Sequence, residues 1–399
     1  MKILDGGNVC SARGFRAAGL NCGVKEELKD LALVYSELGA SGAGVYTKNR
    51  VRAAPIQVCR EHLQDGNARA VVLNSGNANA CTGDPGLDNA RRMCDLTAEK
   101  LGLAAAEVVV CSTGVIGVQL PMDAIVKGIP QVVEALSVHG GEDAATAIMT
   151  TDTVPKTFAI EMEIKGANVR IGGMAKGAGM IAPDMATMLS VVTTDVDIAP
   201  DLLQQALASA IDQSFNCITV DGDMSTNDTV IVLANGASGV SVIEGDEAVG
   251  EFSAGLVMVC RELARQIARD GEGATKLVSI QVSGARDKEE ARQVGLSVAN
   301  SNLVKTAVFG RDPNWGRILC AVGYSRVAID PDRVRVSLCG TAIYDEGSGL
   351  SFDQDALIEL MGAEEIPIEI DLAQGGAEAD IFTCDFSYDY VRINAEYTT

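Results

Sequence analysis

Histidine is scarce in this chain, which has only two among its 399 residues. His62 lies in the polar stretch CREHLQDG and His139 in the turn-like stretch VHGGED, and neither stands near a nucleophile motif. The sequence therefore argues against a histidine-based catalytic triad, a histidine-rich metal site and a histidine acid–base pair. If the chain is an enzyme, its general base must be another group.

Aromatic residues are also few, at 4% of the chain, whereas glycine is abundant, with 42 residues. We therefore expect a core of Ala, Val, Ile and Leu with many close backbone contacts. No apolar run approaches the roughly 18 residues of a membrane span. The N-terminal stretch MKILDGGNVCSARGF lacks the apolar segment of a signal peptide, so we expect a protein that is neither membrane-spanning nor secreted.

Basic residues are outnumbered, with 32 Lys and Arg against 54 Asp and Glu, which gives a formal net charge of −22. Such a surface repels phosphate backbones and anionic membranes, so no nucleic-acid or membrane partner is expected. The eleven cysteines are irregularly spaced and form no C-x-x-C pair. This pattern is typical of reduced thiols in a cytoplasmic protein and does not indicate a disulfide framework or a metal site.

Strand and helix signals alternate along the chain, which predicts an α/β or α+β fold. Strands are expected at 68–76, 107–117, 189–198, 228–236 and 276–284, and helices at 86–101, 122–137, 201–212, 251–269 and 286–299. The later segments LVKTAVFG, VRVSLCG, IPIEIDL and DIFTCDFSYDYVRI are interpreted as short strands. We therefore divide the chain into a main domain, 1–284, and a smaller C-terminal α/β domain, 285–399.

The segment 171–195, IGGMAKGAGMIAPDMATMLSVVTTD, is the most unusual part of the sequence. Four glycines, at positions 172, 173, 177 and 179, precede Thr187, and a hydrophobic strand follows it. Glycines permit tight backbone geometry, and a strand start is a rigid platform for a nucleophile. We interpret Thr187 as a nucleophile that attacks the carbonyl of Ala186, so that the chain cleaves itself between them. The new α-amine, with a reference pKa of about 7.7–8.0, can then serve as base for the same hydroxyl.

On composition alone, an ordinary glycine-rich turn before a strand is the simpler interpretation of this segment. A dinucleotide-binding loop is rejected, because Pro183 and Asp184 stand where the helix after G-A-G-M-I-A should continue. The stretch G-E-G-A-T-K at 271–276 lacks the spacing of a phosphate-binding P-loop.

Longer motifs make the interpretation specific. The stretch KGAGMIAPDMATML resembles the autoprocessing signature of the ornithine acetyltransferase family, also called glutamate N-acetyltransferases of arginine biosynthesis. Further family-like segments follow in the expected order along essentially the whole chain: NSGNANACTG, STGVIG, TTDTVPK, SFNCITVDGDMSTNDT, DGEGATK, VKTAVFGRDPNWGRI and the terminal NAEYTT.

The resemblance implies an αββα sandwich that processes itself into an α chain, 1–186, and a β chain, 187–399. Thr187 would then accept the acetyl group as an ester. Thr113 and Gly114 match the pair that forms the family's oxyanion hole, where hydrogen-bond donors stabilise a tetrahedral intermediate. The family's α2β2 heterotetramer is implied as the assembly.

The resemblance also implies a set of substrate contacts: Thr153, Lys176, Thr187, Glu272, Asn394 and Thr399. A lysine ammonium can hold a substrate carboxylate, and the Glu272 carboxylate can pair with a substrate ammonium. Thr153 has two neighbours, Thr150 and Thr151, that could be confused with it. The stretch DYVRIN is expected to be a strand that ties down the C-terminus.

The implied reaction has two steps, in which N2-acetyl-L-ornithine acetylates Thr187 and L-glutamate then takes the acetyl group. A bifunctional enzyme that also uses acetyl-CoA is expected, with a monofunctional ornithine acetyltransferase as the alternative. No metal or organic cofactor is implied. A self-cleaving aminopeptidase or amidohydrolase of the same fold and a non-enzymatic binding protein remain as rivals, although DGEGATK and NAEYTT favour the transferase.

Overall fold

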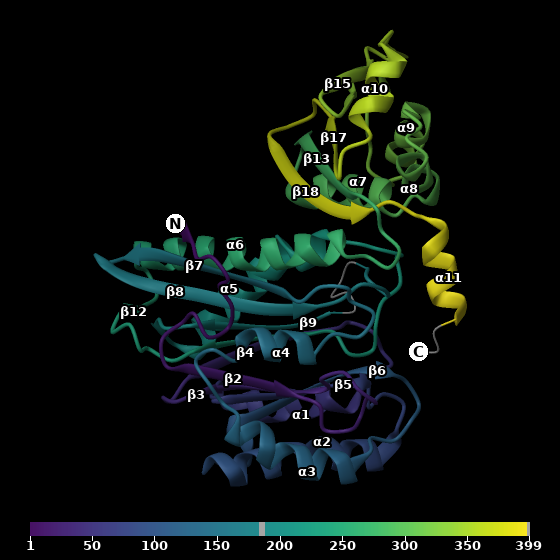
Figure 1. Ribbon diagram of the computed structural model, residues 1–399. Helices are drawn as coiled ribbons and strands as arrows, with labels where there is room; N and C mark the ends of the chain where they lie inside the picture. Colours follow the sequence, from purple (N-terminus) through teal and green to yellow (C-terminus); the bar gives the residue numbers. More distant parts are fainter. Residues whose placement is uncertain (183–187, 397–399) are drawn as a thin grey trace.

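The main domain is built from two stacked β-sheets with helices on both outer faces (Figure 1). The structure, a computed structural model, describes residues 1–182 and 188–396. The helices α5 (Pro200–Asp212) and α6 (Glu247–Arg269) cover the first sheet, and α1 (Ala54–His62), α2 (Gly83–Leu101) and α3 (Met122–Glu134) cover the second. This αββα sandwich confirms the expected fold class.

The first sheet has the strand order β1 (Lys2–Ile3), β7 (Lys156–Ile164), β8 (Ala167–Lys176), β9 (Leu189–Thr194), β11 (Thr229–Ala234) and β4 (Ser41–Tyr46). The neighbours β9 and β11 are parallel, and every residue in both is buried. Because helices cover one face of these strands and the second sheet covers the other, both read as largely apolar runs without alternation.

The second sheet has the order β2 (Phe15–Leu20), β3 (Leu31–Ser36), β5 (Ala70–Asn77) and β6 (Val108–Val115), with α4 (Gly141–Ala147) packed against β2 and β3. The core between the two sheets is mostly Ala, Val, Ile and Leu, as the composition predicts, and Phe15 is the one aromatic among its fully buried members. Short elements outside the two sheets are β10 (Asp197–Ile198), β12 (Ser241–Val242) and the 3-10 turns Leu63–Asp65, Ala105–Glu107 and Phe215–Cys217.

The smaller domain is a third sheet with helices. Its strand order is β16 (Ser348–Gly349), β15 (Thr341–Asp345), β14 (Arg335–Leu338), β17 (Glu365–Asp371), β13 (Leu277–Ala285) and β18 (Ala377–Cys384). The helices are α7 (Lys288–Ala299), α8 (Asn302–Phe309), α9 (Trp315–Gly323) and α10 (Gln354–Leu360), with a 3-10 turn at Pro331–Arg333. Since β13 pairs with β17 and β18, the predicted boundary at 284/285 falls one strand too late.

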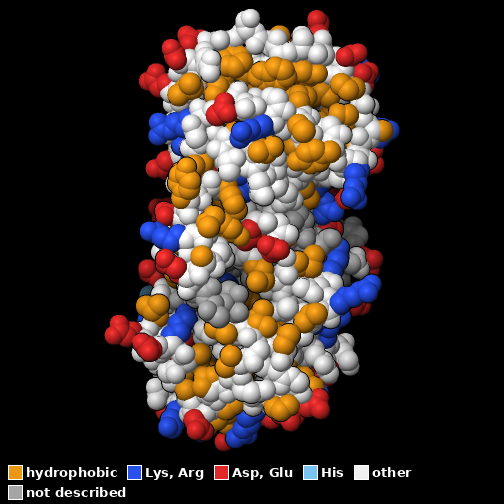
Figure 2. All heavy atoms as spheres, turned by 90° about the vertical axis from the view of Figure 1, so that its right-hand side faces the viewer, with side chains coloured by type: hydrophobic (Ala, Val, Ile, Leu, Met, Phe, Trp, Pro, Cys, Tyr) orange, Lys and Arg blue, Asp and Glu red, His pale blue; other side chains and the backbone are white. Residues whose placement is uncertain are grey.

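The last helix, α11 (Tyr388–Glu396), descends from the smaller domain along the side of the main domain (Figure 1). The prediction that DYVRIN forms a strand is therefore wrong, and so is the prediction that LVKTAVFG forms a strand, because α8 covers it. Figure 2 faces this side of the molecule and shows hydrophobic side chains in a band across the upper part and in smaller groups below it, between acidic and basic side chains.

Candidate functional site

A cavity of about 250 Å³ lies where the ends of β6 and β8 meet the segment 221–227 and helix α11. This volume is below the roughly 300–1,000 Å³ of pockets that hold drug-sized ligands, so the cavity suits a small metabolite. Its lining residues are Ala78, Thr113, Gly114, Ile116, Thr150, Thr151, Lys176, Gly179, Met180, Asp221, Asp223, Met224, Ser225, Asn227, Glu272, Tyr390 and Asn394.

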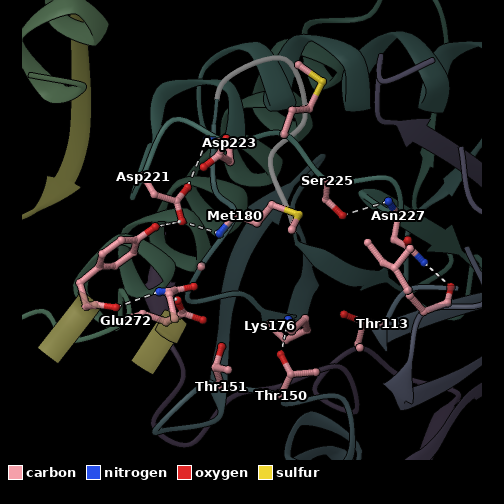
Figure 3. A pocket seen from close by; sticks show the side chains of 17 residues that line it. Thr113, Thr150, Thr151, Lys176, Met180, Asp221, Asp223, Ser225, Asn227 and Glu272 are labelled. Carbon is pink, nitrogen blue, oxygen red and sulfur yellow. Dashed lines mark hydrogen bonds between the residues drawn. The ribbon is translucent and has the colours of Figure 1, made fainter. Parts of the chain in front are cut away.

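The chemistry-bearing side chains are spread around the cavity. In the view of Figure 3, Thr113 and Asn227 lie on one side, Glu272 and Asp221 lie on the other, and Lys176 lies between them. The cavity therefore presents hydrogen-bonding groups at one end, acids at the other and a cation in the middle.

Thr113 and Gly114 reach the cavity at the end of β6, which pairs in parallel with β5. Gly114 lies opposite Gly76 and has a φ of +132°, a conformation that favours glycine. A Cβ at position 114 would stand 2.3 Å from the Gly76 carbonyl carbon. Absence of a side chain thus lets the two strands approach closely where Gly114 lines the cavity.

Lys176 is the last residue of β8 rather than part of a glycine loop, and only 3% of its surface is exposed. Its Nζ donates to Thr150 Oγ1 at 2.7 Å and lies 3.8 Å from Asp152 Oδ2. Burial lowers the pKa of Lys176 and the nearby Lys156 adds to this, whereas Asp152 and Glu272 oppose it. A buried ammonium that faces a cavity is suited to bind a carboxylate of a small ligand.

A buried charge cluster lies next to Lys176. Lys156 Nζ is 2.7 Å from Asp152 Oδ1 and 2.5 Å from Asp270 Oδ2, and Asp152 also accepts from Gly177 N at 2.6 Å. Burial by itself raises the pKa of Asp152, but Lys176 and Lys156 hold it well below its usual range. The cluster fixes the end of β8 against the start of β7 and the end of α6.

Thr153 is not among the residues that line the cavity. Its backbone N donates to Asp270 Oδ2 at 3.0 Å, and its hydroxyl bonds to the same carboxylate. Thr150 and Thr151 line the cavity instead. The motif TTDTVPK could not show which threonine lines the cavity. Thr153 is held by Asp270, which lies 117 residues away in sequence.

Glu272 and Asn394 meet at the acidic end of the cavity. Asn394 Nδ2, on α11, donates to Glu272 Oε2 at 2.8 Å, and Glu272 N donates to Ala178 O at 2.8 Å. A Cβ on Gly179 would stand 2.4 Å from the Glu272 carboxyl carbon. Glycine at 179 therefore makes room for the Glu272 side chain, which the sequence interpretation did not anticipate.

Asp221 and Tyr390 extend this acidic end and were missed by sequence reasoning. Asp221 accepts from Met180 N at 2.6 Å, from Ile181 N at 2.9 Å and from the Tyr390 hydroxyl at 3.3 Å. Burial raises the pKa of Asp221, and burial together with the Asp221 charge raises the pKa of Tyr390. The available signal was the family-like segment SFNCITVDGDMSTNDT, which is rich in acids, amides and hydroxyls.

Ala186, Thr187 and Thr399 lie outside the residues that the structure describes, so their roles stay predictions. The residue that follows Thr187 is described. Met188 N donates to Asp228 Oδ1 at 3.1 Å, and Met188 O accepts from Thr229 N at 3.1 Å. The strand after Thr187 therefore begins beside the segment 225–227 that lines the cavity.

The arrangement suits a small ligand that carries both a carboxylate and an ammonium group, with a carbonyl placed near Thr113 and Gly114. Within residues 1–182 and 188–396, no group of His, Cys, Asp and Glu could hold a metal ion. In the same part of the chain, no helix is both long and apolar enough to cross a membrane.

An αββα sandwich with a small polar cavity at the ends of β6 and β8 defines a class of protein with two stacked sheets and a site for a small charged ligand at one end of them. The model of the ArgJ family matches residues 16–399. This chain belongs to the ArgJ family, which confirms the resemblance deduced from its motifs.

Curated relatives extend over the whole chain. The proteins called arginine biosynthesis bifunctional protein ArgJ from Symbiobacterium thermophilum and Caldanaerobacter subterraneus subsp. tengcongensis are 49% and 46% identical, with 100% of each chain covered. Among solved structures, ornithine acetyltransferase complexed with ornithine from Mycobacterium tuberculosis is 42% identical. That match covers 46% of this chain and 97% of the other, with a TM-score of 0.43.

Proposed function

We propose that this chain is a bifunctional acetyltransferase of arginine biosynthesis. It moves an acetyl group from N2-acetyl-L-ornithine to L-glutamate through an ester on Thr187, and it also makes N-acetyl-L-glutamate from acetyl-CoA. The observation that carries the proposal is the cavity shared by Lys176, Glu272 and Gly114, beside the strand that follows Thr187. Membership of the ArgJ family and the names of the curated relatives support the same function.

Self-processing comes first. Thr187 Oγ attacks the Ala186 carbonyl carbon, and the hydroxyl proton passes to the departing amide nitrogen, so that the C–N bond breaks as an ester forms. Water hydrolyses the ester, which leaves a carboxylate on Ala186 and a free α-amine on Thr187. With a reference pKa of about 7.7–8.0, this amine can act as the base for its own hydroxyl. It replaces the histidine that the sequence does not offer.

Acetyl transfer then follows in two steps. Thr187 Oγ attacks the acetyl carbonyl of N2-acetyl-L-ornithine while its proton passes to the α-amine. The Thr113–Gly114 pair stabilises the oxyanion, and one such donor is typically worth about 3–4 kcal/mol. Collapse breaks the C–N bond, and the proton leaves with ornithine. The amine of L-glutamate then attacks the ester, which gives N-acetyl-L-glutamate and restores Thr187.

Substrate recognition uses opposite charges at separate places. Lys176 binds the α-carboxylate that both substrates carry, and Glu272, held by Asn394, faces the ammonium of the ornithine side chain. Thr150 and Thr151 are the loop threonines that this cavity offers, in place of Thr153. Thr399 is proposed as a further contact from the end of the chain.

The two products of cleavage are expected to remain together. In the first sheet, β9 and β11 from the β chain lie between β8 and β4 from the α chain, so ladder hydrogen bonds join the products on both sides. We infer an α2β2 heterotetramer in a reducing cytoplasm, which suits the eleven free cysteines. Neither metal nor organic cofactor is needed, because hydroxyl, amine and oxyanion donors supply every group in the scheme.

The test combines intact mass spectrometry with acetyl exchange. Wild type and Thr187→Ser should each give two polypeptides, and Thr187→Ala should give one of 41.6 kDa. Carbon-13 acetyl from N2-acetyl-L-ornithine should reach glutamate only in the processed proteins, and acetyl-CoA should serve as a second donor.

An uncut wild-type chain that still exchanges acetyl groups would overturn the mechanism. Release of acetate at a rate independent of glutamate would instead identify a hydrolase. Exchange from N2-acetyl-L-ornithine without activity toward acetyl-CoA would identify the monofunctional enzyme.

A further inference from the structure

Two consecutive residues, Asn227 and Asp228, connect the two sheets beside the cavity. They precede β11, the parallel partner of β9, and Asn227 is 6% exposed. Asn227 Nδ2 donates to Ala78 O at 2.6 Å and to Ser112 O at 2.8 Å. Ser112 directly precedes Thr113 in β6, so Asn227 fixes the strand end that carries the oxyanion pair.

Asp228 makes the corresponding contact to the other sheet. It is fully buried, and its Oδ1 accepts from Met188 N at 3.1 Å while Thr229 N donates to Met188 O at 3.1 Å. The carboxyl oxygen thus takes the place of a backbone acceptor and extends the β9–β11 pairing by one residue. Met188 directly follows Thr187, so this contact fixes the residue next to the proposed nucleophile, two positions after Ala186.

The second oxygen of Asp228, Oδ2, is buried and accepts no hydrogen bond from the described residues. Burial raises the pKa of Asp228 well above its usual range, and hydrogen bonding from Met188 N and the Thr47 side chain, together with the Lys176 charge, partly offsets the effect. A buried polar atom without a partner costs stability, and such atoms in native proteins commonly mark functional sites.

The far ends of the same two strands provide a natural comparison. Asp195 follows β9, is fully buried and accepts from Arg170 N at 2.8 Å. Asn235 follows β11, and its Nδ2 donates to Arg13 O at 2.9 Å. At the end away from the cavity, the strand pair is therefore followed by the same two residue types as at the near end: an aspartate after β9 and an asparagine after β11.

We propose that Asn227 and Asp228 are positioning residues that align the oxyanion pair with Thr187 for self-cleavage and acetyl transfer. This inference rests on the proposed function. Asn227 sets the place of Thr113 and Gly114, and Asp228 sets the place of Met188 and, through one peptide unit, of the nucleophile. The two residues are joined by one peptide bond, so a shift of either moves both reacting partners relative to each other.

The experiment uses the full chain and compares two sets of variants. Near-end variants change Asn227 or Asp228, beside the cavity, and far-end variants change Asp195 or Asn235, at the other end of β9 and β11. Cell-free synthesis followed by mass spectrometry gives the rate at which the two polypeptides appear, and thermal melting reports the fold. Asn227→Ala and Asp228→Ala should slow cleavage by about 100-fold, the scale expected when a reacting group is displaced by about 1 Å. Asp195→Ala and Asn235→Ala should lose comparable melting temperature yet cleave at the wild-type rate.

The conservative change Asp228→Asn adds a readout that general destabilisation does not move. Its amide oxygen can still accept from Met188 N, so cleavage should recover to within about tenfold of wild type. If Asp228→Asn and Asp228→Ala slow self-cleavage equally, the positioning role is overturned. The same holds if the near-end and far-end variants slow self-cleavage to the same extent. Wild-type rates in both near-end alanine variants would also overturn it, whereas an uncut wild type would refute the proposed function itself.

Discussion

At position 114 the neighbouring backbone leaves no room for a side chain. An added Cβ would stand 2.3 Å from the Gly76 carbonyl carbon and 2.5 Å from Asn77 N, and real Cβ atoms do not approach backbone this closely. Gly117, three residues later, also has a positive φ, of +81°, but a Cβ there would meet nothing within 4 Å. Comparing the two glycines therefore separates the cost of a positive φ from the cost of displacing Thr113 and Gly114, the proposed oxyanion pair.

We expect Gly114→Ala to lower the acetyl exchange rate by about 100- to 1,000-fold, because one oxyanion donor is moved away from the reacting carbonyl. Gly117→Ala should cost about 1 kcal/mol of stability through its positive φ and leave the exchange rate near that of wild type. Exchange kinetics and thermal melting of both variants check the expectation. Equal activity in the two variants would contradict the role given to Gly114.

Lys25 is a second lysine close to the cavity. Its Nζ donates to Lys29 O at 3.2 Å and to Met149 O at 2.5 Å. Met149 directly precedes Thr150, which lines the cavity. Burial, with Lys176 adding to the effect, lowers the pKa of Lys25 from 10.5 to about 8, against the opposing charge of Asp30. The folded state therefore releases this proton more readily than the unfolded state does.

The sign of the pH dependence follows from this difference. Between about pH 8 and 10.5 the unfolded chain holds more protons at Lys25 than the folded chain, so the free energy of unfolding rises with pH in this window. Measured as a difference in melting temperature from Lys25→Met, wild type should gain stability from pH 8 to 10.5 and stay level below pH 8. A melting-temperature difference between wild type and Lys25→Met that does not change with pH would contradict the prediction.

At the scale of elements, long amphipathic helices were predicted well and short ones were not. Helices expected at 86–101 and 251–269 are observed at Gly83–Leu101 and Glu247–Arg269, because many turns repeat the same apolar spacing. The eight residues of α8 fit a strand or a helix equally well, and a single contact, from Val304 N to the Ser301 hydroxyl, marks the helix start. Short apolar segments take their conformation from such local contacts and from packing, which periodicity does not reveal.

Helix α11 is the element whose misassignment affects the site. No residue of Tyr388–Glu396 is buried, so the sequence shows no apolar face from which this helix could be predicted. The helix is held by Asn394 against Glu272 and by the Tyr390 hydroxyl against Asp221. Its place is thus set by polar contacts to residues more than a hundred positions earlier, and only the resemblance to the family pointed to Asn394.

Asn394→Ala should raise KM for N2-acetyl-L-ornithine by about tenfold, because the loss of one hydrogen bond to a charged group is worth roughly 1.5–3 kcal/mol. Self-cleavage and melting temperature should stay close to wild type, since the helix contributes no buried residue. Arg392→Ala is the matched control, because Arg392 pairs only with the exposed Asp389 of the same helix among the contacts described. An unchanged KM in Asn394→Ala would remove α11 from the substrate site.

At the scale of the whole molecule, the sequence predicted two domains but not where the chain passes between them. The chain leaves the main domain after α6 and returns after β18, and the two crossings lie side by side. Strand signals in 276–284 were correct, yet nothing local tells whether a strand joins the preceding sheet or the next one. The site is equally non-local, since Asn227 and Ser112 are 115 residues apart.

Asp385 joins the two crossings. It is 1% exposed, and its Oδ1 accepts from Thr275 N at 2.7 Å and from Lys276 N at 3.0 Å, while the Thr275 hydroxyl bonds to Oδ2. The segment so held continues back to Glu272, and the residues after Asp385 lead into α11. This carboxylate therefore ties the two crossings together next to the acidic end of the cavity, in addition to the ion pairs that α6 makes with the smaller domain.

Removing this carboxylate should weaken the coupling between the domains. Asp385→Ala leaves the buried Lys276 N–H without an acceptor, at about 1–3 kcal/mol, and also frees the part-buried Thr275 N–H; it should convert one calorimetric unfolding transition into two. Asp385→Asn keeps an oxygen for both N–H groups and should retain the single transition. KM should rise in the alanine variant, because Glu272 and α11 lose their common support, while the rate of self-cleavage should change little. If both variants unfold in one transition at the wild-type midpoint, the smaller domain is held by its other contacts, and the acidic end of the cavity does not depend on Asp385.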